Sequence, residues 1–411
     1  MSDLIVNEKC IGCTLCKNIC PKNAVSLEPD KHGFYVAKIN ENMCINCGLC
    51  HKKCIMASPV SNNDLLKAKC FYAFSTNREE RIASTSGGVF FLLAKSVLEK
   101  GGYVCGCVWD ENFVAKHIVT NSYEDLKLMR GSKYVQSNMG DCFSTIRNIL
   151  EKNITVLFSG TGCQVNALDE FLDSKLKANL ITCSVVCGGV PSPAVWSHYV
   201  KALESKANSR ITSVNLRAKK HGWLVPELEI GFKSGKRINQ NLLQENYYGT
   251  NFGLGLFINQ CCMNCRFKLY NLKSDIVLSD HWGIDYNHLE RSENLGSSAI
   301  ITLTEKGIGA FEKINHLLCF ESGKITDIID SHKVLTKDHD PNIDRERFFE
   351  DFNNDRNDVL AVLKKYYKKW EKKAGRGFAF KVLYRTGLYN KLYLRRWKKR
   401  NKNRVTNETI G

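Results

Sequence analysis

The sequence has no long apolar run. No stretch reaches about 18 uninterrupted apolar residues, so no membrane-spanning helix is expected. The first residues, Met1 to Lys9, contain no apolar segment of signal-peptide length. These absences predict a cytoplasmic chain, in a compartment where thiols remain reduced. Its 19 cysteines are odd in number and many stand in short-spaced runs, which favours metal ligation over a set of disulfides.

Acidic residues are scarce only near the carboxyl end. The whole chain has 59 Lys+Arg and 42 Asp+Glu, a net charge of +17. From Ala361 to Gly411 there are 17 basic and 2 acidic residues, which leaves 42 basic and 40 acidic residues for the rest. The main body is therefore nearly neutral, and the net charge does not mark the whole protein as a nucleic-acid binder. With 411 residues and 43% hydrophobic content, the chain can form two or three domains with buried cores.

Two cysteine runs near the amino terminus share one spacing. Both read C-x2-C-x2-C-x3-C, the bacterial [4Fe-4S] pattern, and Pro21 follows the first run whereas Ile55 follows the second. In this pattern three cysteines of a run cap one cluster and the fourth reaches the other cluster. The expected ligands of the first cluster are Cys10, Cys13, Cys16 and Cys54. The expected ligands of the second cluster are Cys44, Cys47, Cys50 and Cys20.

The alternative for these runs is a pair of structural zinc sites, in which C-x2-C pairs are also common. Clusters are favoured because a zinc site has no use for the interleaved fourth cysteine. Residues 1–58 are therefore expected to form a two-cluster ferredoxin-type domain, with a hairpin made by residues 24–27 and 35–39. Such a module carries single electrons.

A linker over residues 59–82 is expected to join this domain to an α/β domain over residues 83–345, because residues 58–64 have turn-forming composition. Strand-like runs at 103–109, 154–158 and 180–186 alternate there with helical patterns. Glycine-rich turns after these strands place a candidate site at the carboxyl ends of the strands. No G-x-G-x-x-G occurs, so the ordinary dinucleotide fingerprint is missing.

Six motifs of this domain occur in a fixed order. They are SGG at 86–88, GSKYVQS at 131–137, GTGCQ at 160–164, CGGVPSP at 187–193, CMNCRF at 262–267 and SDIVLSDHWG at 274–283. Together they resemble the coenzyme F-420 hydrogenase/dehydrogenase beta-subunit family, which also includes reductases of chlorophyll precursors. The resemblance covers about residues 83–284. It departs from the family at Gly162, where proline is usual, and at Gly188, where histidine is usual.

The resemblance implies an iron–sulfur flavoprotein that binds FAD and passes electrons between clusters and a hydride carrier or organic substrate. A phosphate can approach the small residues at a helix start, and Lys133 would stabilise reduced anionic flavin. Tyr134 would stack on the flavin ring or hydrogen-bond to it. For Lys133 a solvated surface position is the alternative. The implied cofactor-binding residues are Ser86, Gly87, Gly88, Ser132, Lys133, Tyr134, Gly160 and Thr161.

Four cysteines of this domain form a further candidate set. Cys163 and Cys187 end strands, and Cys262 and Cys265 form a C-x2-C pair. With the resemblance they predict a third [4Fe-4S] cluster between the ferredoxin domain and the flavin. The alternative is that each is a small buried hydrophobe, and Cys261 is adjacent but out of spacing. The cysteines expected in the core are Cys70, Cys105, Cys107, Cys142, Cys183 and Cys319.

The catalytic candidates are Lys133, His221 and His281. Each histidine stands in a polar loop, and an imidazole suits proton transfer near neutral pH. For both histidines we favour the ordinary alternative of a polar loop residue. No acid–base role is assigned at Gly188, because it carries no imidazole.

Residues 346–411 are expected to form a basic, amphipathic helical tail. Paired lysines mark a helix over 354–373, and aromatic residues and leucines recur at three- and four-residue spacing over 378–400. Three partners remain open. They are the anionic inner face of a membrane, another protein or the body of this chain, and nucleic acid. Nucleic acid is disfavoured because no recognised nucleic-acid-binding fold accompanies the tail.

The expected fold class is α+β and α/β in several domains: a ferredoxin-like two-cluster domain, an α/β flavin-binding domain and a basic helical tail. The expected function is an oxidoreductase that moves electrons between a ferredoxin or other redox protein, the clusters, FAD and an organic substrate, a deazaflavin or a nicotinamide. The sequence is compatible with electron flow in either direction. The alternatives are an electron-transfer subunit of a larger complex and an accessory protein of membrane-associated surface-polysaccharide biosynthesis.

Overall fold

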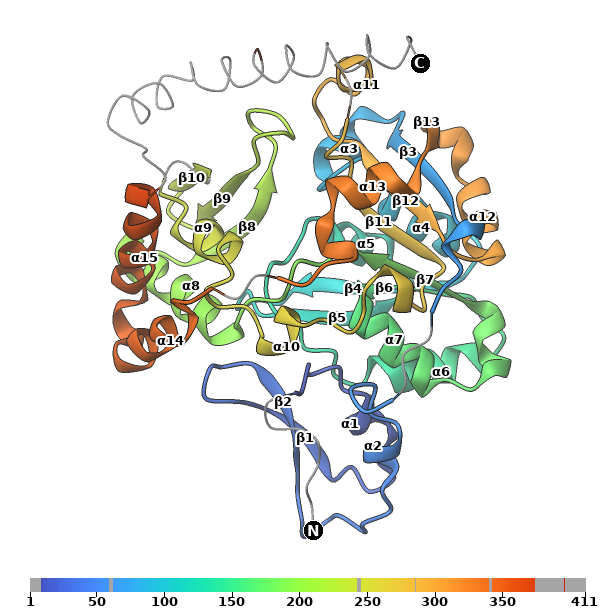
Figure 1. Cartoon of the computed structure of the whole chain (residues 1–411), viewed down its shortest axis with the longest axis horizontal. Coiled ribbons are helices and arrows are strands. Elements are labelled where there is room, and N and C mark those ends of the chain that lie inside the picture. The colour runs from blue at the N-terminus through green and yellow to red at the C-terminus, as the bar shows by residue number, and fades with distance from the viewer. Residues whose placement is uncertain are drawn as a thin grey trace.

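The computed structural model describes residues 9–58, 62–241, 245–284, 286–339, 342–373 and 395. They form three units: an amino-terminal domain, drawn in blue in Figure 1, a large sheet with helices, and a smaller sheet with helices that includes the orange and red α14 and α15 (Arg345–Asn354 and Val359–Lys373). Within the described residues, no helix has the length and apolar character needed to cross a membrane. The expected mixed α/β class with a ferredoxin-like start is confirmed.

The amino-terminal domain is built from two similar halves. Its hairpin, β1 (Val25–Pro29) and β2 (Tyr35–Ile39), is antiparallel, as predicted. A short helix ends each of the two cysteine loops, α1 (Leu15–Ile19) and α2 (Leu49–Lys52). The residue before each helix has a left-handed backbone, with φ of 64° and 71°. These turns fold each cysteine loop back toward the hairpin.

The central sheet has eight strands. Their bounds are β3 (Lys69–Ser75), β4 (Tyr103–Trp109), β5 (Ala115–Thr120), β6 (Val156–Thr161), β7 (Leu180–Val185), β11 (Ile276–Asp280), β12 (Ser298–Thr302) and β13 (Leu318–Gly323). The order across the sheet is β13-β3-β12-β11-β7-β6-β4-β5. The four neighbours β11, β7, β6 and β4 run parallel, and antiparallel strands flank them on both sides. The carboxyl ends of the parallel strands therefore meet at one edge.

Helices cover both faces of this sheet. Neighbouring side chains of a strand point to opposite faces, and Leu157 and Phe158 of β6 accordingly belong to different cores. The helices on the first face are α4 (Val89–Leu98), α5 (Tyr123–Met129) and α12 (Glu305–Glu312). Those on the second face are α6 (Cys142–Leu150), α7 (Gly162–Phe171) and α13 (Ile325–Ser331). Because both faces are buried, the parallel strands are apolar along their length.

The segment 59–82 is not the linker that its turn-rich start predicted. It contains β3, which pairs with β12 on one side and with β13 on the other, and then α3 (Arg78–Ala83). Ala73 and Phe74 within β3 are buried. Both partner strands come from the carboxyl-terminal half of the sequence, so local composition could not reveal the pairing.

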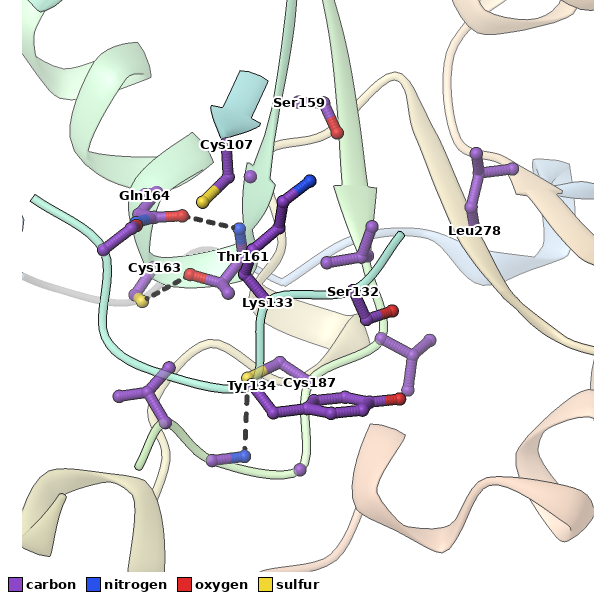
Figure 2. A pocket seen from close by; sticks show the side chains of 18 of the residues that line it. Cys107, Ser132, Lys133, Tyr134, Ser159, Thr161, Cys163, Gln164, Cys187 and Leu278 are labelled. Carbon is purple, nitrogen blue, oxygen red and sulfur yellow. Dashed lines mark hydrogen bonds between the residues drawn. The ribbon is translucent and has the colours of Figure 1, made fainter. Parts of the chain in front are cut away.

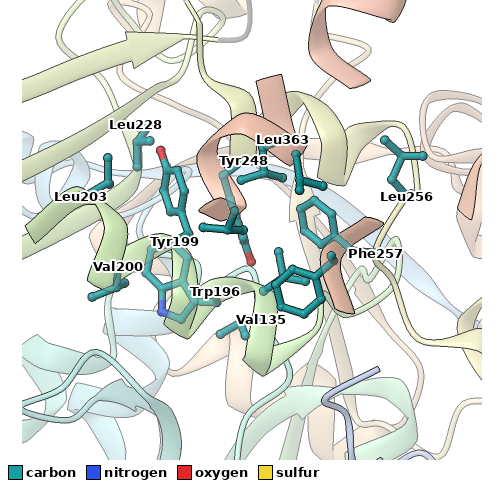
Figure 3. Close-up of a cluster of buried hydrophobic side chains, with 14 of the residues drawn as sticks. Val135, Trp196, Tyr199, Val200, Leu203, Leu228, Tyr248, Leu256, Phe257 and Leu363 are labelled. Carbon is teal, nitrogen blue, oxygen red and sulfur yellow. The ribbon is translucent and has the colours of Figure 1, made fainter. Parts of the chain in front are cut away.

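The smaller unit is an antiparallel sheet of three strands with four helices. The strands are β8 (Ile211–Ala218), β9 (Glu227–Phe232) and β10 (Arg237–Asn241). The helices are α8 (Pro193–Ala207), α9 (Tyr247–Gly253), α14 and α15. Figure 3 shows their shared core, in which Trp196, Tyr199 and Tyr248 from α8 and α9 pack near Leu363 of α15. Two further short helices, α10 (Gln260–Met263) and α11 (Tyr286–Arg291), lie in loops.

The first part of the expected basic tail packs on the body of the chain. Residues 346–373 lie in α14 and α15, and Phe348, Phe352 and Leu363 are fully buried in the core of the smaller unit. The amphipathic pattern over 378–400 lies outside the described residues, apart from Arg395.

This packing predicts a strong effect of truncating Leu363. Leu363→Ala is expected to lower the free energy of unfolding of the smaller unit by about 2–5 kcal/mol, because it leaves a cavity in a closed core. Lys364→Ala, at the exposed neighbouring position, is the matched control and should change it little. Thermal unfolding of the two variants measures the difference, and equal midpoints would contradict the core position of α15.

Candidate functional site

The eight amino-terminal cysteines surround two small cavities. One is lined by Cys10, Cys13, Cys16 and Cys54, and Cys50 lines it as well. The other is lined by Cys20, Cys44, Cys47 and Cys50. Each cavity thus combines three cysteines of one run with the fourth cysteine of the other run. This interleaving is the arrangement that the spacing predicted, and the donor set fits two [4Fe-4S] clusters.

Backbone N–H groups point at several of these sulfurs. Gly12 and Ala37 donate to Cys10 Sγ, both over 3.4 Å, and Ala24 donates to Cys20 Sγ over 3.3 Å. Hydrogen bonds of this kind stabilise negative charge on a cluster and its thiolates. Burial, and to a smaller extent the neighbouring Cys10 thiol, raises the pKa of the Cys16 thiol to about 12, so a thiolate there needs a positive charge beside it. Bound iron would supply that positive charge.

A cavity of about 380 Å³ opens at the carboxyl ends of the four parallel strands. Residues at or just after the end of each strand line it, among them Cys107 near the end of β4, Thr161 of β6, Cys187 after β7 and Asp280 of β11. This is the edge at which the alternating strand and helix pattern predicted a site. Its volume lies within the range of cofactor pockets.

The four candidate cysteines of the α/β domain come together on one wall of this cavity. Cys163, Cys187, Cys262 and Cys265 all line it, and their thiols are close enough to raise one another's pKa. Burial is the larger cause, and raises the pKa of Cys163 to about 12 and that of Cys187 to about 11. Gly189 donates an N–H to Cys187 Sγ and Phe267 donates one to Cys265 Sγ, both over 3.4 Å. The set repeats the features of the two amino-terminal sites.

This cysteine set adjoins the first amino-terminal site. Cys13 of the ferredoxin-type domain interacts electrostatically with Cys163 of the sheet domain. Cys261, the spare candidate, also lines the cavity, and its Sγ lies 3.8 Å from the carbonyl oxygen of Cys10. The first amino-terminal site therefore lies between the second amino-terminal site and the four-cysteine wall, and the wall borders the open cavity.

Seven of the eight residues implied in flavin binding line the same cavity. They are Ser86, Gly88, Ser132, Lys133, Tyr134, Gly160 and Thr161. Gly87 lies behind them, because a Cβ there would come within 2.4 Å of the carbonyl oxygen of Ala73, and its N–H donates to Ser298 Oγ. Gly88 has a left-handed backbone and precedes α4, whose first N–H groups have no side-chain cap. These N–H groups are available to an anionic group in the cavity.

Lys133 and Tyr134 extend from one loop in different directions (Figure 2). The Lys133 ammonium donates to the carbonyl oxygens of Leu128 and Arg130, both over 2.8 Å. Burial lowers its pKa to about 8, so it remains mostly charged at neutral pH. The Tyr134 ring contacts Phe252 at 5.2 Å between centroids, and its hydroxyl accepts from Arg217 over 3.3 Å.

His117 lines the cavity and was missed in the sequence, where nothing distinguishes it from other strand residues. Its Nε2 lies 3.2 Å from the carbonyl oxygen of Ser159, which can only accept, so Nε2 carries the hydrogen. Burial lowers the pKa of His117 to about 4, which keeps the ring neutral. Its Nδ1 is then a buried acceptor without a partner in the described structure. A ligand with an N–H or O–H donor would satisfy it.

His221 and His281 do not line the cavity. His221 Nδ1 lies 2.6 Å from a carboxylate oxygen of Glu227. His281 stacks on Tyr72 at 3.7 Å, and burial lowers its pKa to about 3. The space next to Gly188 is bordered by another histidine, His339, whose ring lies 3.8 Å from the position of a Cβ at residue 188.

Gln136 joins the cavity to the ferredoxin-type domain, a role that the sequence did not indicate. Its side-chain amide donates to the carbonyl oxygens of Ile11 and Tyr35, both over 3.1 Å. Its carbonyl oxygen accepts from the Tyr35 N–H over 2.7 Å. Gln136 is 4% exposed, and a Cβ at Gly12 would come within 2.5 Å of it. The contact fixes the first cysteine loop against the cavity.

Two family models match the chain. Residues 9–57 match the 4Fe-4S dicluster domain, and residues 154–328 match the C terminus of the coenzyme F420 hydrogenase/dehydrogenase beta subunit. Residues 154–328 are therefore similar to the carboxyl-terminal domain of this beta-subunit family. The resemblance seen in the sequence motifs is thereby confirmed. The matched part of the beta-subunit domain holds all four wall cysteines, whereas Lys133 and the 86–88 turn precede it.

Two similar proteins accompany these matches. Over 51 residues, 12% of this chain, it is 37% identical to an uncharacterized ferredoxin of Methanocaldococcus jannaschii, and the match spans 65% of that ferredoxin's length. A chain of the F420-reducing [NiFe] hydrogenase complex from Methanosarcina barkeri is similar in structure, with a TM-score of 0.43 and 18% identity. That similarity covers 78% of this chain and 95% of the other.

Proposed function

We propose that this chain is an iron–sulfur flavoprotein oxidoreductase, with FAD in the large cavity and a [4Fe-4S] cluster on its cysteine wall. The observation that carries the proposal is the convergence on one cavity of four cysteines and seven implied flavin residues, next to the first dicluster site. FAD exchanges single electrons with clusters and electron pairs with an organic molecule. The substrate is an organic molecule or hydride carrier.

The residues present fit a flavin. The start of α4 offers N–H groups without a side-chain cap to its phosphates, and Lys133 offers a cation on the cavity wall. The isoalloxazine ring carries an N–H donor between two carbonyl acceptors. His117 Nδ1 is an acceptor that lacks a donor, so a ring of this kind would satisfy it. Cys163, Cys187, Cys262 and Cys265 would hold the third cluster.

The protein's own groups can position a ligand and exclude water. Lys133 is fixed by two carbonyl oxygens, so its ammonium is held at one place on the cavity wall. Its positive charge favours an anionic ligand beside it. Tyr134, fixed by Phe252 and Arg217, offers an aromatic surface to a planar ring.

Anaerobic purification tests the proposal. The protein is expected to contain about one FAD per chain, released by acid and measured by fluorescence, together with about twelve irons. A preparation with iron but no flavin would overturn the flavoprotein assignment. A protein with flavin and about eight irons would overturn only the assignment of the third cluster.

Lys133→Ala is expected to lower flavin occupancy at least several-fold, because it removes a buried ammonium from the cavity wall and loosens its loop. Lys127→Ala is the control, since Lys127 lies nearby in α5 but pairs with exposed Glu124. Flavin and iron are measured in both variants. A Lys133→Ala protein with the flavin content of the unaltered protein would show that Lys133 does not bind the flavin.

A further inference from the structure

The two cysteine loops are copies of one motif, but the rest of the chain covers only the first copy. Leu15 is 1% exposed and packs in the core formed by α6 and α7, whereas Leu49, at the same place in the second copy, is 37% exposed. Ile11 packs partly buried against that core, whereas its counterpart Ile45 is 55% exposed. Met43, just before the second loop, is 46% exposed.

In the covered copy, the surface around the cysteine loop faces another candidate redox site. Its middle cysteine, Cys13, interacts electrostatically with Cys163 of the sheet domain, where we place the third cluster. The middle cysteine of the second copy, Cys47, is exposed. Electron transfer slows steeply with distance, so the second cluster is the one that an external carrier can reach closely. We call the surface formed by Met43, Ile45, Cys47 and Leu49 the port face.

The rim of the port face is basic. Lys22 lines the second small cavity together with Cys44 and Cys47, and Lys52 ends α2. Both are exposed, and neither forms an ion pair with another described residue. Glu41, the acidic residue of the same stretch, already has a contact within the chain. An apolar centre with a basic rim complements a partner that has an apolar patch within an acidic surface.

We propose that the port face is the docking site of a small, acidic, one-electron carrier protein, which exchanges electrons with this chain through the second cluster. In each encounter one electron moves: the carrier is oxidised by one electron and the chain is reduced by one, or the reverse. The inference rests on the proposed function, because it needs the clusters to be present. To the proposed function this inference adds the place where electrons enter or leave the chain and the charge of the partner's surface.

Stopped-flow reduction of the anaerobic holoprotein by a reduced acidic ferredoxin tests the docking site. Met43→Ser, and separately Lys52→Glu, are each expected to lower the second-order rate constant several-fold at low salt, and neither residue lines the second small cavity. Added salt should slow the unaltered protein and have little effect on the charge-reversed one. The control is Leu66→Ser with Lys67→Glu, a similarly exposed pair outside the port face, which should behave as the unaltered protein.

Reduction by dithionite separates this inference from the proposed function. All variants are expected to bleach fully with dithionite and to keep their iron, since no ligand is changed. Wild-type rates and wild-type salt dependence in both port-face variants, with full dithionite reduction, would overturn the docking site alone. A purified chain that lacks clusters or flavin would instead overturn the proposed function.

Discussion

Anaerobically purified Cys262→Ala protein is expected to carry about eight irons per chain, against about twelve in the unaltered protein. The Cys262 thiol lies on the cavity wall and interacts electrostatically with Cys187, Cys163 and Cys265, so its loss removes one of the four sulfurs that would hold the cluster. The loss should remove one of three cluster signals in electron paramagnetic resonance and leave the two dicluster signals.

Cys261→Ala is the matched control for that experiment. Cys261 is the next residue along the chain and lines the same cavity, but its sulfur lies near the Cys10 carbonyl, outside the four-cysteine set. Its substitution should leave about twelve irons. A Cys262→Ala protein that also keeps about twelve, or an unaltered protein with about eight, would show that these cysteines are only buried side chains.

Gln136→Ala is expected to slow flavin reduction through the dicluster domain roughly tenfold. The change leaves the Tyr35 N–H and two carbonyl oxygens of the ferredoxin-type domain without partners, at a cost of about 1–3 kcal/mol for each buried group left unsatisfied. That cost weakens the contact which fixes the first cysteine loop at the cavity. Stopped-flow absorbance at the flavin band, with a ferredoxin as donor, measures the rate.

Two measurements keep this second prediction specific. Direct photoreduction of the flavin bypasses the clusters and should proceed at the unaltered rate in Gln136→Ala. Asn353→Ala, which removes a more peripheral bond to the same domain at the Lys31 carbonyl, should keep the ferredoxin-dependent rate. An unchanged ferredoxin-dependent rate in Gln136→Ala would mean that this junction does not govern electron flow.

Local patterns predicted much of this molecule. The doubled cysteine spacing predicted which sulfurs share a cavity, because short loops leave few ways to place three thiols around one centre. The alternation of strands and helices predicted a site at the strand ends, because parallel strands bring their carboxyl ends to one edge. The C-x2-C pair and two strand-end cysteines likewise converge on that edge.

Contacts between distant segments escaped prediction. β3 looks like part of a linker because its pairing partners, β12 and β13, lie far along the sequence. The body of this chain was one of three partners left open for the basic tail, and the lysine pairs of α15 did not reveal that its other side closes a core. Gln136 and His117 are ordinary polar residues in the sequence. Their roles depend on which carbonyl and N–H groups the fold brings to them.

The placement of β3 between two late strands affects how the chain can be made. The dicluster domain contains all eight of its own cysteines, so both of its cysteine sets are complete once residue 54 has been synthesised. β3, which follows directly, has neither neighbour in the sheet until β12 and β13 have been synthesised. Its two edges therefore stay open for most of translation, a state prone to mispairing and slow to resolve. The two amino-terminal clusters can thus be inserted early, whereas the third must wait until Cys265 has emerged.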